Sequence, residues 1–255
     1  MSKNVLFLVA IEVPGWEHRS APYKYGISSY ENWCEKNNVE LFIQRELIHP
    51  HEKMKVNFTR YYAFELLEKA GIEWDQVLFT DVDSIIHPDC PSPFNEVSED
   101  ELGLVHANGC YDWVCRSMEN YAHFFEEFNT FDIFKYFSSG FLLFSKKHKD
   151  LFEEVLSFYW KNEEKIKEIQ IKLMNGTDQP IINHLVQKNN IKSKYLSYNY
   201  CFIDIYRKMG LREDMPFTKI PGIYQYNAIP NNKDTSQTAY WMKKTYNTLY
   251  KEKQI

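Results

Sequence analysis

The sequence predicts an α/β fold with a mostly parallel central sheet, and three features support this prediction. Apolar runs typical of buried strands occur at 5–13, 39–44 and 76–80. Helical patterns alternate with these strands over the first half of the chain, as they do in parallel sheets. The 255 residues, 44% of them hydrophobic, suffice for one large core, and no repeat or linker divides 1–255. We therefore expect a single domain.

The first half of the chain gives its elements in a clear order. The strand at 5–13 is followed by a loop and then by a helix that Ser28 or Ser29 could cap. After the second strand, residues 59–70 have the apolar spacing of a helix, and Gly71 is a typical stop. The third strand comes directly after this helix.

The second half is predicted in less detail. Residues 101–107 and 137–145 have the pattern of strands, and a glycine turn opens the second of them. The aromatic stretch 110–134 has no clear period. Residues 148–173 predict a long amphipathic helix with a break near Asn162. Residues 175–189 predict a turn and then a helix, which Thr177 or Asp178 would cap.

Two carboxylates follow the third predicted strand. Asp81 and Asp83 are one residue apart, directly after the apolar run at 76–80. Ligands of open α/β sheets bind beyond the carboxyl ends of the strands, so both side chains would lie at such a crevice. Close carboxylates need a cation, a shared proton or full solvation. A metal site and an exposed acidic turn therefore both fit this stretch.

The overall composition narrows the classes of function. A net charge of −5 gives no support to nucleic-acid binding. The five cysteines form no Cys-x-x-Cys pair, which indicates free thiols packed in the interior of a protein in a reducing compartment. The apolar N-terminal stretch is too short to span a membrane and lacks a cleavage site. We therefore expect a cytoplasmic protein without a transmembrane segment.

Three motifs in a fixed order resemble those of a known enzyme family. They are Asp81-x-Asp83 after a strand, Ser139-Gly140 before a strand, and Asp178-Gln179 with an asparagine five residues after the aspartate. With Arg60 on the helix before the third strand, this order resembles nucleotide-sugar glycosyltransferases of the GT-A fold. It is most similar to the retaining family-eight group, and the resemblance covers roughly residues 4 to 235. It implies a Rossmann-like GT-A domain.

The resemblance also implies an activity. It implies transfer of a sugar from a nucleotide-sugar donor, UDP-linked, to a glycan, lipid or protein acceptor, with retention. Asp81 and Asp83 would bind Mn²⁺ or Mg²⁺, which prefer oxygen ligands and stabilise the leaving diphosphate. Asp81 would also contact the ribose, and Arg60 the phosphates or ribose. A tyrosine after the first strand, Tyr23 or Tyr25, would stack on the base, and we select Tyr25. Arg60 could instead lie on a solvated helix face, and the tyrosines could be core residues.

The third metal ligand departs from the family pattern. The family has a histidine near the C-terminus with a lysine after it, and residues 221–233 contain no histidine. Gln225 or Asn227 could supply an amide oxygen instead, and we select Asn227. Lys233 lies where the diphosphate-binding lysine is expected, although a surface lysine is the alternative.

The two motifs expected to bind the sugar could each have a purely structural role instead. Ser139 and Gly140 would contact the donor sugar, or they form only a turn at a strand edge. Asp178 and Gln179 would face the sugar and stabilise an oxocarbenium-like centre, or Asp178 only caps a helix. Pro180 replaces a third acidic residue of the family motif.

Other functions remain open at this point. Asp81 in DVDSI could be the nucleophile of a haloacid-dehalogenase-type phosphatase, although no later acidic pair follows an apolar strand. A sugar-nucleotide-binding module without catalysis is a second alternative. An inverting enzyme would need a base, for which Asp178 or Asp112 is available. The aromatic and basic tail at about 239–255 could lie on a membrane surface or pack against the domain.

Overall fold

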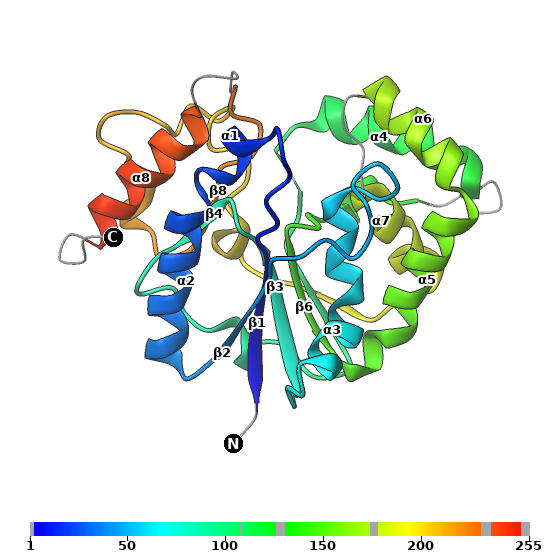
Figure 1. Ribbon diagram of the computed structural model, residues 1–255, viewed down its shortest axis with the longest axis horizontal. Helices are drawn as coiled ribbons and strands as arrows, with labels where there is room; N and C mark the ends of the chain where they lie inside the picture. The colour runs from blue at the N-terminus through cyan, green and yellow to red at the C-terminus, as the bar shows by residue number, and fades with distance from the viewer. Residues whose placement is uncertain (1–2, 108, 126–130, 174–177, 231–235, 251–255) are drawn as a thin grey trace.

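A six-stranded sheet with helices on both faces forms the centre of the protein (Figure 1). The computed structural model describes residues 3–107, 109–125, 131–173, 178–230 and 236–250. The strands are β1 (Asn4–Val9), β2 (Glu40–Gln44), β3 (Gln76–Asp81), β5 (Leu102–Leu104), β6 (Phe141–Ser145) and β7 (Ser193–Tyr195). Their order is β2-β1-β3-β6-β5-β7, and β6 runs antiparallel to the other five. The predicted α/β fold with a mostly parallel sheet is therefore confirmed.

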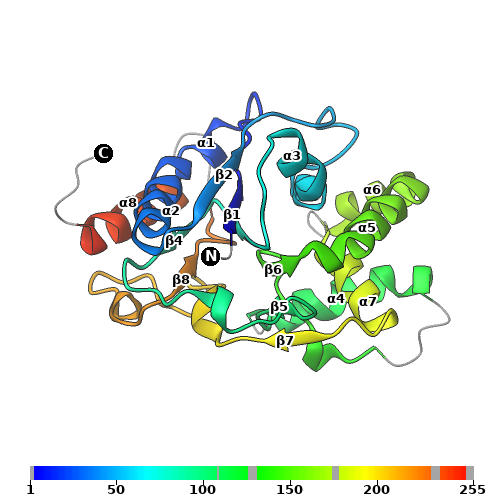
Figure 2. The ribbon, with the colours of Figure 1, turned by 90° about the horizontal axis from the view of Figure 1, so that it is seen from below.

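The helices divide into two groups. They are α1 (Glu17–Ser20), α2 (Tyr23–Asn37), α3 (Ala63–Lys69), α4 (Tyr111–Ala122), α5 (Lys149–Lys161), α6 (Glu163–Leu173), α7 (Gln179–Lys188) and α8 (Gln237–Leu249). Figures 1 and 2 place α2 and α8 on one side of the sheet, and α3, α5 and α7 on the other. Among the described residues, no helix combines the length and the apolar character needed to cross a bilayer.

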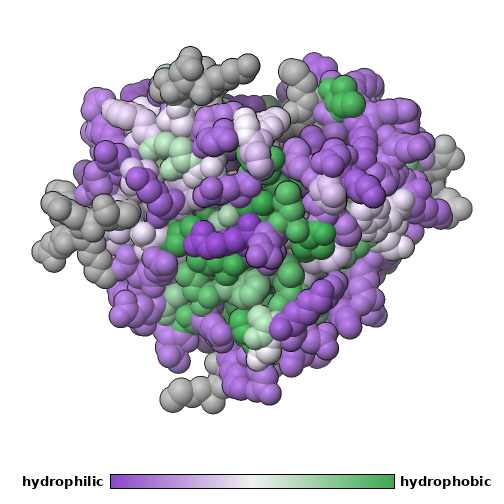
Figure 3. Space-filling view, in the orientation of Figure 1, coloured by the Kyte–Doolittle hydropathy of each residue, from purple (hydrophilic) through white to green (hydrophobic). Residues whose placement is uncertain are grey.

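The strand pattern explains the two groups. Val5 and Phe7 of β1 are fully buried in a core with α3, α5 and α7, while Leu6 and Leu8 are fully buried in a core with α2. A strand turns alternate side chains to opposite faces, so a continuous apolar run must be covered on both. Figure 3 shows apolar side chains in the middle of one face of the molecule, between polar surfaces on either side.

A second, two-stranded sheet stands beside the carboxyl end of the large one. Strands β4 (Ser84–Ile86) and β8 (Ile223–Gln225) are antiparallel, with Ser84 opposite Gln225. Helix α8 packs on this sheet and on α2 through Met242 and Tyr246, which are buried. The apolar side of the C-terminal tail thus packs against the protein, which is one of the two alternatives that the sequence left open.

Several element boundaries differ from the sequence-based expectations. Strand β1 ends at Val9, and Glu12 is already exposed. Helix α2 begins at Tyr23 after Pro22, and the Ser29 hydroxyl donates to the Gly26 carbonyl inside the helix, so it does not cap one. The aromatic stretch without a clear period contains α4.

The expected helix at 59–70 has two parts. A 3-10 helix at Val56–Tyr62 leads into α3, which ends before Gly71 with its φ of +69°. Helices α5 and α6 are separated at Asn162, which confirms the break expected there. The five cysteines are all free, but only Cys34, Cys90 and Cys201 are buried, so the expectation that all five are packed in the interior is wrong for the exposed Cys115.

Candidate active site

The site begins where strands β3 and β6 meet. Because β6 is reversed, its first residue, Phe141, lies opposite Thr80 near the end of β3. The backbone amide of Asp81 donates to the carbonyl of Gly140 at 3.3 Å. The reversed strand therefore brings the Ser139-Gly140 turn to the carboxyl end of β3, where Asp81 and Asp83 lie.

Both oxygens of the Asp81 carboxylate are hydrogen-bonded. Oδ1 accepts from Arg60 Nη2 at 3.0 Å, and Oδ2 accepts from Gln225 Nε2 at 2.7 Å. A Cβ atom on Gly140 would lie 2.0 Å from Gln225 Nε2 and 2.4 Å from Asp81 Oδ2. Only glycine leaves enough room at this position for the contact between Asp81 and Gln225.

Arg60 connects two carboxylates beneath the surface. The side chain is 4% exposed, and Nε lies 3.5 Å from Asp178 Oδ2 while Nη2 contacts Asp81. The guanidinium group also donates to the carbonyl of Ser139 and lies 4.2 Å from the centre of the Phe79 ring. Burial lowers the pKa of Arg60, but Asp178 and Asp81 outweigh this effect and raise it. Arg60 is therefore a fixed positive charge between the two acids.

Asp178 and Gln179 lie at the start of α7. The Asp178 side chain is fully buried, and its Oδ2 accepts from Tyr61 Oη at 2.8 Å. Asp178 occupies the cap position, but its side chain makes no capping hydrogen bond to the helix. Gln179 Oε1 accepts from the backbone amide of Ser139 at 3.0 Å. The expected cap interaction is therefore absent, because the carboxylate turns toward Arg60 and Tyr61 instead.

Asn183, the asparagine of the third motif, fastens α7 to the turn before β6. Its side chain accepts from the Phe137 amide and donates to the Phe137 carbonyl, both at 2.9 Å. The same amide group donates to the carbonyl of Gln179. This buried asparagine fixes Gln179 relative to Ser139, so its role here is structural.

The pKa values of both acids of the Asp-x-Asp motif are raised from their ordinary values in the protein alone. Burial raises the pKa of Asp83 to about 7, and the neighbouring Asp81 adds to the rise. Burial also raises the pKa of Asp81, and the Arg60 charge opposes that rise. A bound cation would lower both pKa values, because it favours the charged form of both carboxylates. These residues are thus suited to a hard divalent cation.

The described residues hold no group of three or more His, Cys, Asp or Glu side chains that could bind a metal. Asn227, selected from the sequence as third ligand, accepts from the Asp204 amide at 2.9 Å and donates to Asp204 Oδ1 at 3.0 Å. Gln225, the other candidate, contacts Asp81 directly. Of the two amides, the structure thus brings Gln225 to the motif. Lys233 lies outside the described residues, as does Thr177.

Of the two tyrosines after the first strand, Tyr23 is the one near the acids. Tyr25 is buried between α2 and α8, with its ring centre 6.2 Å from that of Tyr246. Tyr23 is half-buried, and its pKa is raised to about 12 by burial and by Asp83 and Asp81. The structure therefore gathers Arg60, Asp81, Ser139 and the α7 residues, whereas it places Tyr25 in the core.

Two further residues of the site escaped sequence analysis. Tyr61 holds Asp178, and Cys201 Sγ lies 3.5 Å from Gln225 Oε1. Tyr61 follows Arg60 directly, but nothing distinguishes it from the other 17 of the 18 tyrosines in the sequence. Cys201 belongs to no sequence motif, and only the folded structure places it beside Gln225.

Comparison with known proteins identifies the fold. No protein-family sequence profile and no curated protein sequence matches the chain. A solved glycosyltransferase involved in glycosylation of the major capsid of PBCV-1 is similar over 95% of this chain and 98% of its own, with a TM-score of 0.57 and 10% identity. The glycosyltransferase GlyE of Streptococcus pneumoniae TIGR4 gives 0.47 at 14% identity over 99% of this chain and 67% of its own. Mouse xyloside xylosyltransferase 1 gives 0.46 at 11% identity over 89% of this chain and 100% of its own.

The first of these similarities extends over nearly the whole of both chains, and at 10% identity it concerns the fold alone. It agrees with the sheet described above, whose strands are mostly parallel with β6 reversed. The chain has the fold of the GT-A glycosyltransferases.

Proposed function

We propose that this chain is a metal-dependent glycosyltransferase that transfers a sugar from a UDP-linked donor to a glycan, lipid or protein acceptor. One observation carries the proposal. The fold brings Asp81, Arg60 and Asp178 into one group of ion pairs at the carboxyl end of β3, and Gln225 donates a hydrogen bond to Asp81. We call these four residues and Asp83 the carboxylate centre. A glycosyltransferase fold thus occurs together with carboxylates that could hold a divalent cation for a diphosphate.

Asp81 and Asp83 would hold Mn²⁺ or Mg²⁺. Such ions are commonly bound by one or two carboxylates together with substrate phosphates, so the donor itself can complete the ligands. When bound, the metal would neutralise charge on the leaving diphosphate. Gln225 and Asn227 remain candidates for a further oxygen ligand.

The chain's own residues would do the remaining work. Arg60 is held in place before any ligand arrives, so its charge need not be reoriented during the reaction. Gln179 and Ser139 are joined by a hydrogen bond and would position the sugar of the donor. Asp178 would act through Arg60, because its carboxylate is fully buried.

Retention is part of the proposal. An inverting enzyme needs a base that can reach the acceptor hydroxyl. Asp178 is fully buried against Tyr61 and Arg60, and Asp112 is an exposed residue whose carboxylate lies 3.0 Å from Arg116. Neither is placed as a free base, which favours a retaining reaction.

The test is a screen of sugar nucleotides for binding and hydrolysis with and without Mn²⁺. We expect one donor to be hydrolysed only with metal, and Asp83→Asn to lower that rate by about a hundredfold or more. Asp89→Asn is the matched control, because Asp89 is exposed and pairs with Lys36. If Asp83→Asn hydrolyses the donor like the parent, the proposed metal site is wrong.

The alternatives predict different results. A binding module would bind a donor without hydrolysing or transferring it. A phosphatase would form a phosphoaspartate at Asp81, and trapping that adduct would favour it.

A further inference from the structure

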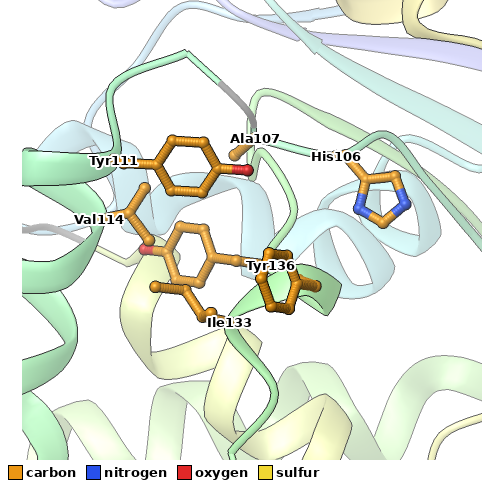
Figure 4. A pocket seen from close by; sticks show the side chains of 7 residues that line it. His106, Ala107, Tyr111, Val114, Ile133 and Tyr136 are labelled. Carbon is orange, nitrogen blue, oxygen red and sulfur yellow. The ribbon is translucent and has the colours of Figure 1, made fainter.

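A pocket lies near the carboxylate centre, at the same edge of the sheet. It has a volume of about 170 Å³ and is formed by the chain after β5, the first turn of α4 and residues 133–136. Figure 4 shows the Tyr111 and Tyr136 rings in this pocket, with the hydroxyl of Tyr111 directed toward Ala107 and that of Tyr136 toward Val114. We call this hollow the aromatic pocket.

The backbone joins the aromatic pocket to the carboxylate centre. Ala107 N donates to the Tyr136 carbonyl at 2.9 Å, and Ser138 N donates to the Val105 carbonyl at 3.0 Å. Tyr136 lies only three residues before Ser139 in the chain, and the backbone amide of Ser139 donates a hydrogen bond to Gln179. Burial raises the pKa of Tyr136, and the nearby side chains of Gln179 and Ser117 oppose that rise. The Tyr136 hydroxyl approaches both side chains, but with neither does it have the geometry of a hydrogen bond. A ligand in the pocket would therefore adjoin the residues that would position the donor sugar.

The pocket has two kinds of surface that suit a sugar ring. Tyr111 and Phe134 are large aromatic side chains that are 54% and 75% exposed, and both line it. Exposed aromatic rings can stack on the apolar C–H face of a pyranose, and a tyrosine adds a polar end. His106, which also lines the pocket, stacks on Tyr195 with ring centres 4.1 Å apart.

Unsatisfied polar groups are concentrated in the same region. Four buried side-chain atoms lack a hydrogen-bond partner in the described part of the chain, and three of them are Trp113 Nε1, Ser117 Oγ and Tyr136 Oη. Tyr136 is 2% exposed and lines the pocket, while Trp113 and Ser117 belong to α4 beside it. Buried polar groups without partners are costly, so such a group beside a hollow indicates a missing polar ligand or water.

The size of the pocket limits the ligand. Pockets for drug-sized molecules have about 300–1,000 Å³, so a hollow of about 170 Å³ has room for a single ring. We propose that the aromatic pocket binds the terminal pyranose of a glycan acceptor. Tyr111 and Phe134 would pack against the apolar face of the sugar ring, and the Tyr136 hydroxyl would form a hydrogen bond with a hydroxyl group of the sugar. This inference rests on the proposed function and narrows its acceptor to a glycan.

The test uses 4-nitrophenyl β-D-galactopyranoside, 4-nitrophenyl β-D-glucopyranoside and lactose as probes of the full chain. Saturation-transfer NMR measures binding, and crystals soaked with the probes locate it. We expect at least one probe to bind in the aromatic pocket, and the Tyr111→Ala/Phe134→Ala double variant to weaken that binding tenfold or more. Tyr240→Ala, which removes an aromatic side chain that is 51% exposed on α8, should leave it unchanged.

The outcomes separate the two proposals. If no probe binds, or if the double variant binds as tightly as the parent, the pocket proposal is overturned. Metal-dependent hydrolysis of a sugar nucleotide by the parent is measured in parallel. Hydrolysis without probe binding overturns the pocket alone, and probe binding without hydrolysis supports the pocket while the proposed function fails. A Tyr136→Phe variant that folds and binds the probes less tightly would locate the hydroxyl contact.

Discussion

The carboxylate centre and the aromatic pocket are neighbours, yet they are built in opposite ways. In the first, Asp81 uses both carboxylate oxygens, and Arg60 contacts Asp81, Asp178 and the Ser139 carbonyl. In the second, two aromatic rings are more than half exposed, and the Tyr136 hydroxyl has no partner in the described part of the chain. In the first region the polar side chains are bonded mainly to one another, whereas in the second a buried hydroxyl has no partner in the described part of the chain.

This difference matches two different tasks. Stabilising charge in a transition state requires dipoles and charges that are fixed in advance, which the carboxylate centre provides. Recognising an acceptor requires surface that remains available until the ligand arrives. Substitutions in the centre should therefore damage activity and stability, while substitutions in the pocket should affect binding and leave stability nearly unchanged.

The largest effect is expected from Gly140→Ala. The added methyl group would collide with Gln225 Nε2 and Asp81 Oδ2, and it would force these two side chains apart. We expect donor hydrolysis to fall by about a hundredfold or more, since catalytic groups displaced by about 1 Å lose that much. Steady-state kinetics and circular dichroism measure activity and folding.

Gly71→Ala is the control for this substitution. Gly71 has a φ of +69° with open space around it, so alanine there adds backbone strain without a collision. It should lower the free energy of unfolding by about 1 kcal/mol and leave hydrolysis unchanged. Equal activities of the two variants would contradict a close-packed carboxylate centre.

A smaller effect is expected from Tyr61→Phe. This change leaves the buried Asp178 carboxylate without the hydrogen bond from Tyr61, at a cost of about 1–3 kcal/mol in the free energy of unfolding. Hydrolysis should fall about tenfold, because Arg60 then pairs differently with Asp178. Denaturant unfolding gives the stability. Tyr62→Phe is the control, because the Tyr62 hydroxyl contacts His49 and Trp160 away from the acids.

A third prediction concerns pH and the aromatic side of the molecule. His184 of α7 lies between the rings of Phe125 and Phe131, and burial lowers its pKa to about 4. The unfolded chain takes up this proton below pH 6.5 whereas the folded chain does not, so stability falls as the pH decreases from 6.5 toward 4. At pH 5.5 the loss should be about 1 kcal/mol relative to pH 7.5.

His184→Phe should remove this part of the pH dependence, even if it changes stability by a constant amount. Unfolding by urea at several pH values measures the slope. His123→Gln, on an exposed residue, should keep the slope of the parent. An unchanged slope in His184→Phe would show that other groups cause the acid sensitivity.

The sequence predicted the structure best where a local residue pattern determines the local structure. The apolar runs predicted β1, β2 and β3, and Asp81 at the end of β3 lies where the pattern placed it. The family resemblance assigned Ser139 and Gln179 to the same donor sugar, and the structure joins these two residues, far apart in the chain, by a hydrogen bond. Strands and motif positions of this kind can be predicted because they depend on short stretches of sequence.

The rest depended on contacts between distant segments. Gly26 of α2 packs against the Val82 carbonyl, which would lie 2.1 Å from a Cβ atom on this residue, and the sequence alone does not show this contact. Gln225 reaches Asp81 because β8 pairs with β4, which directly follows the Asp-x-Asp motif. Tyr61 reaches Asp178 although the two residues are far apart in the sequence. Most of the residues that line the aromatic pocket belong to residues 110–134, where the sequence has no clear helical or strand periodicity.

The smallest effect is expected from Tyr136→Phe, and it compares the two regions directly. Tyr61 and Tyr136 are both buried, but the Tyr61 hydroxyl donates to Asp178 and the Tyr136 hydroxyl has no partner in the described part of the chain. Removing an unpaired buried hydroxyl leaves no partner behind, so the free energy of unfolding should change by less than about 0.5 kcal/mol. Denaturant unfolding of Tyr61→Phe and Tyr136→Phe side by side measures the contrast. Equal losses of stability would mean that the Tyr136 hydroxyl is already satisfied, and the pocket would then lack its free polar group.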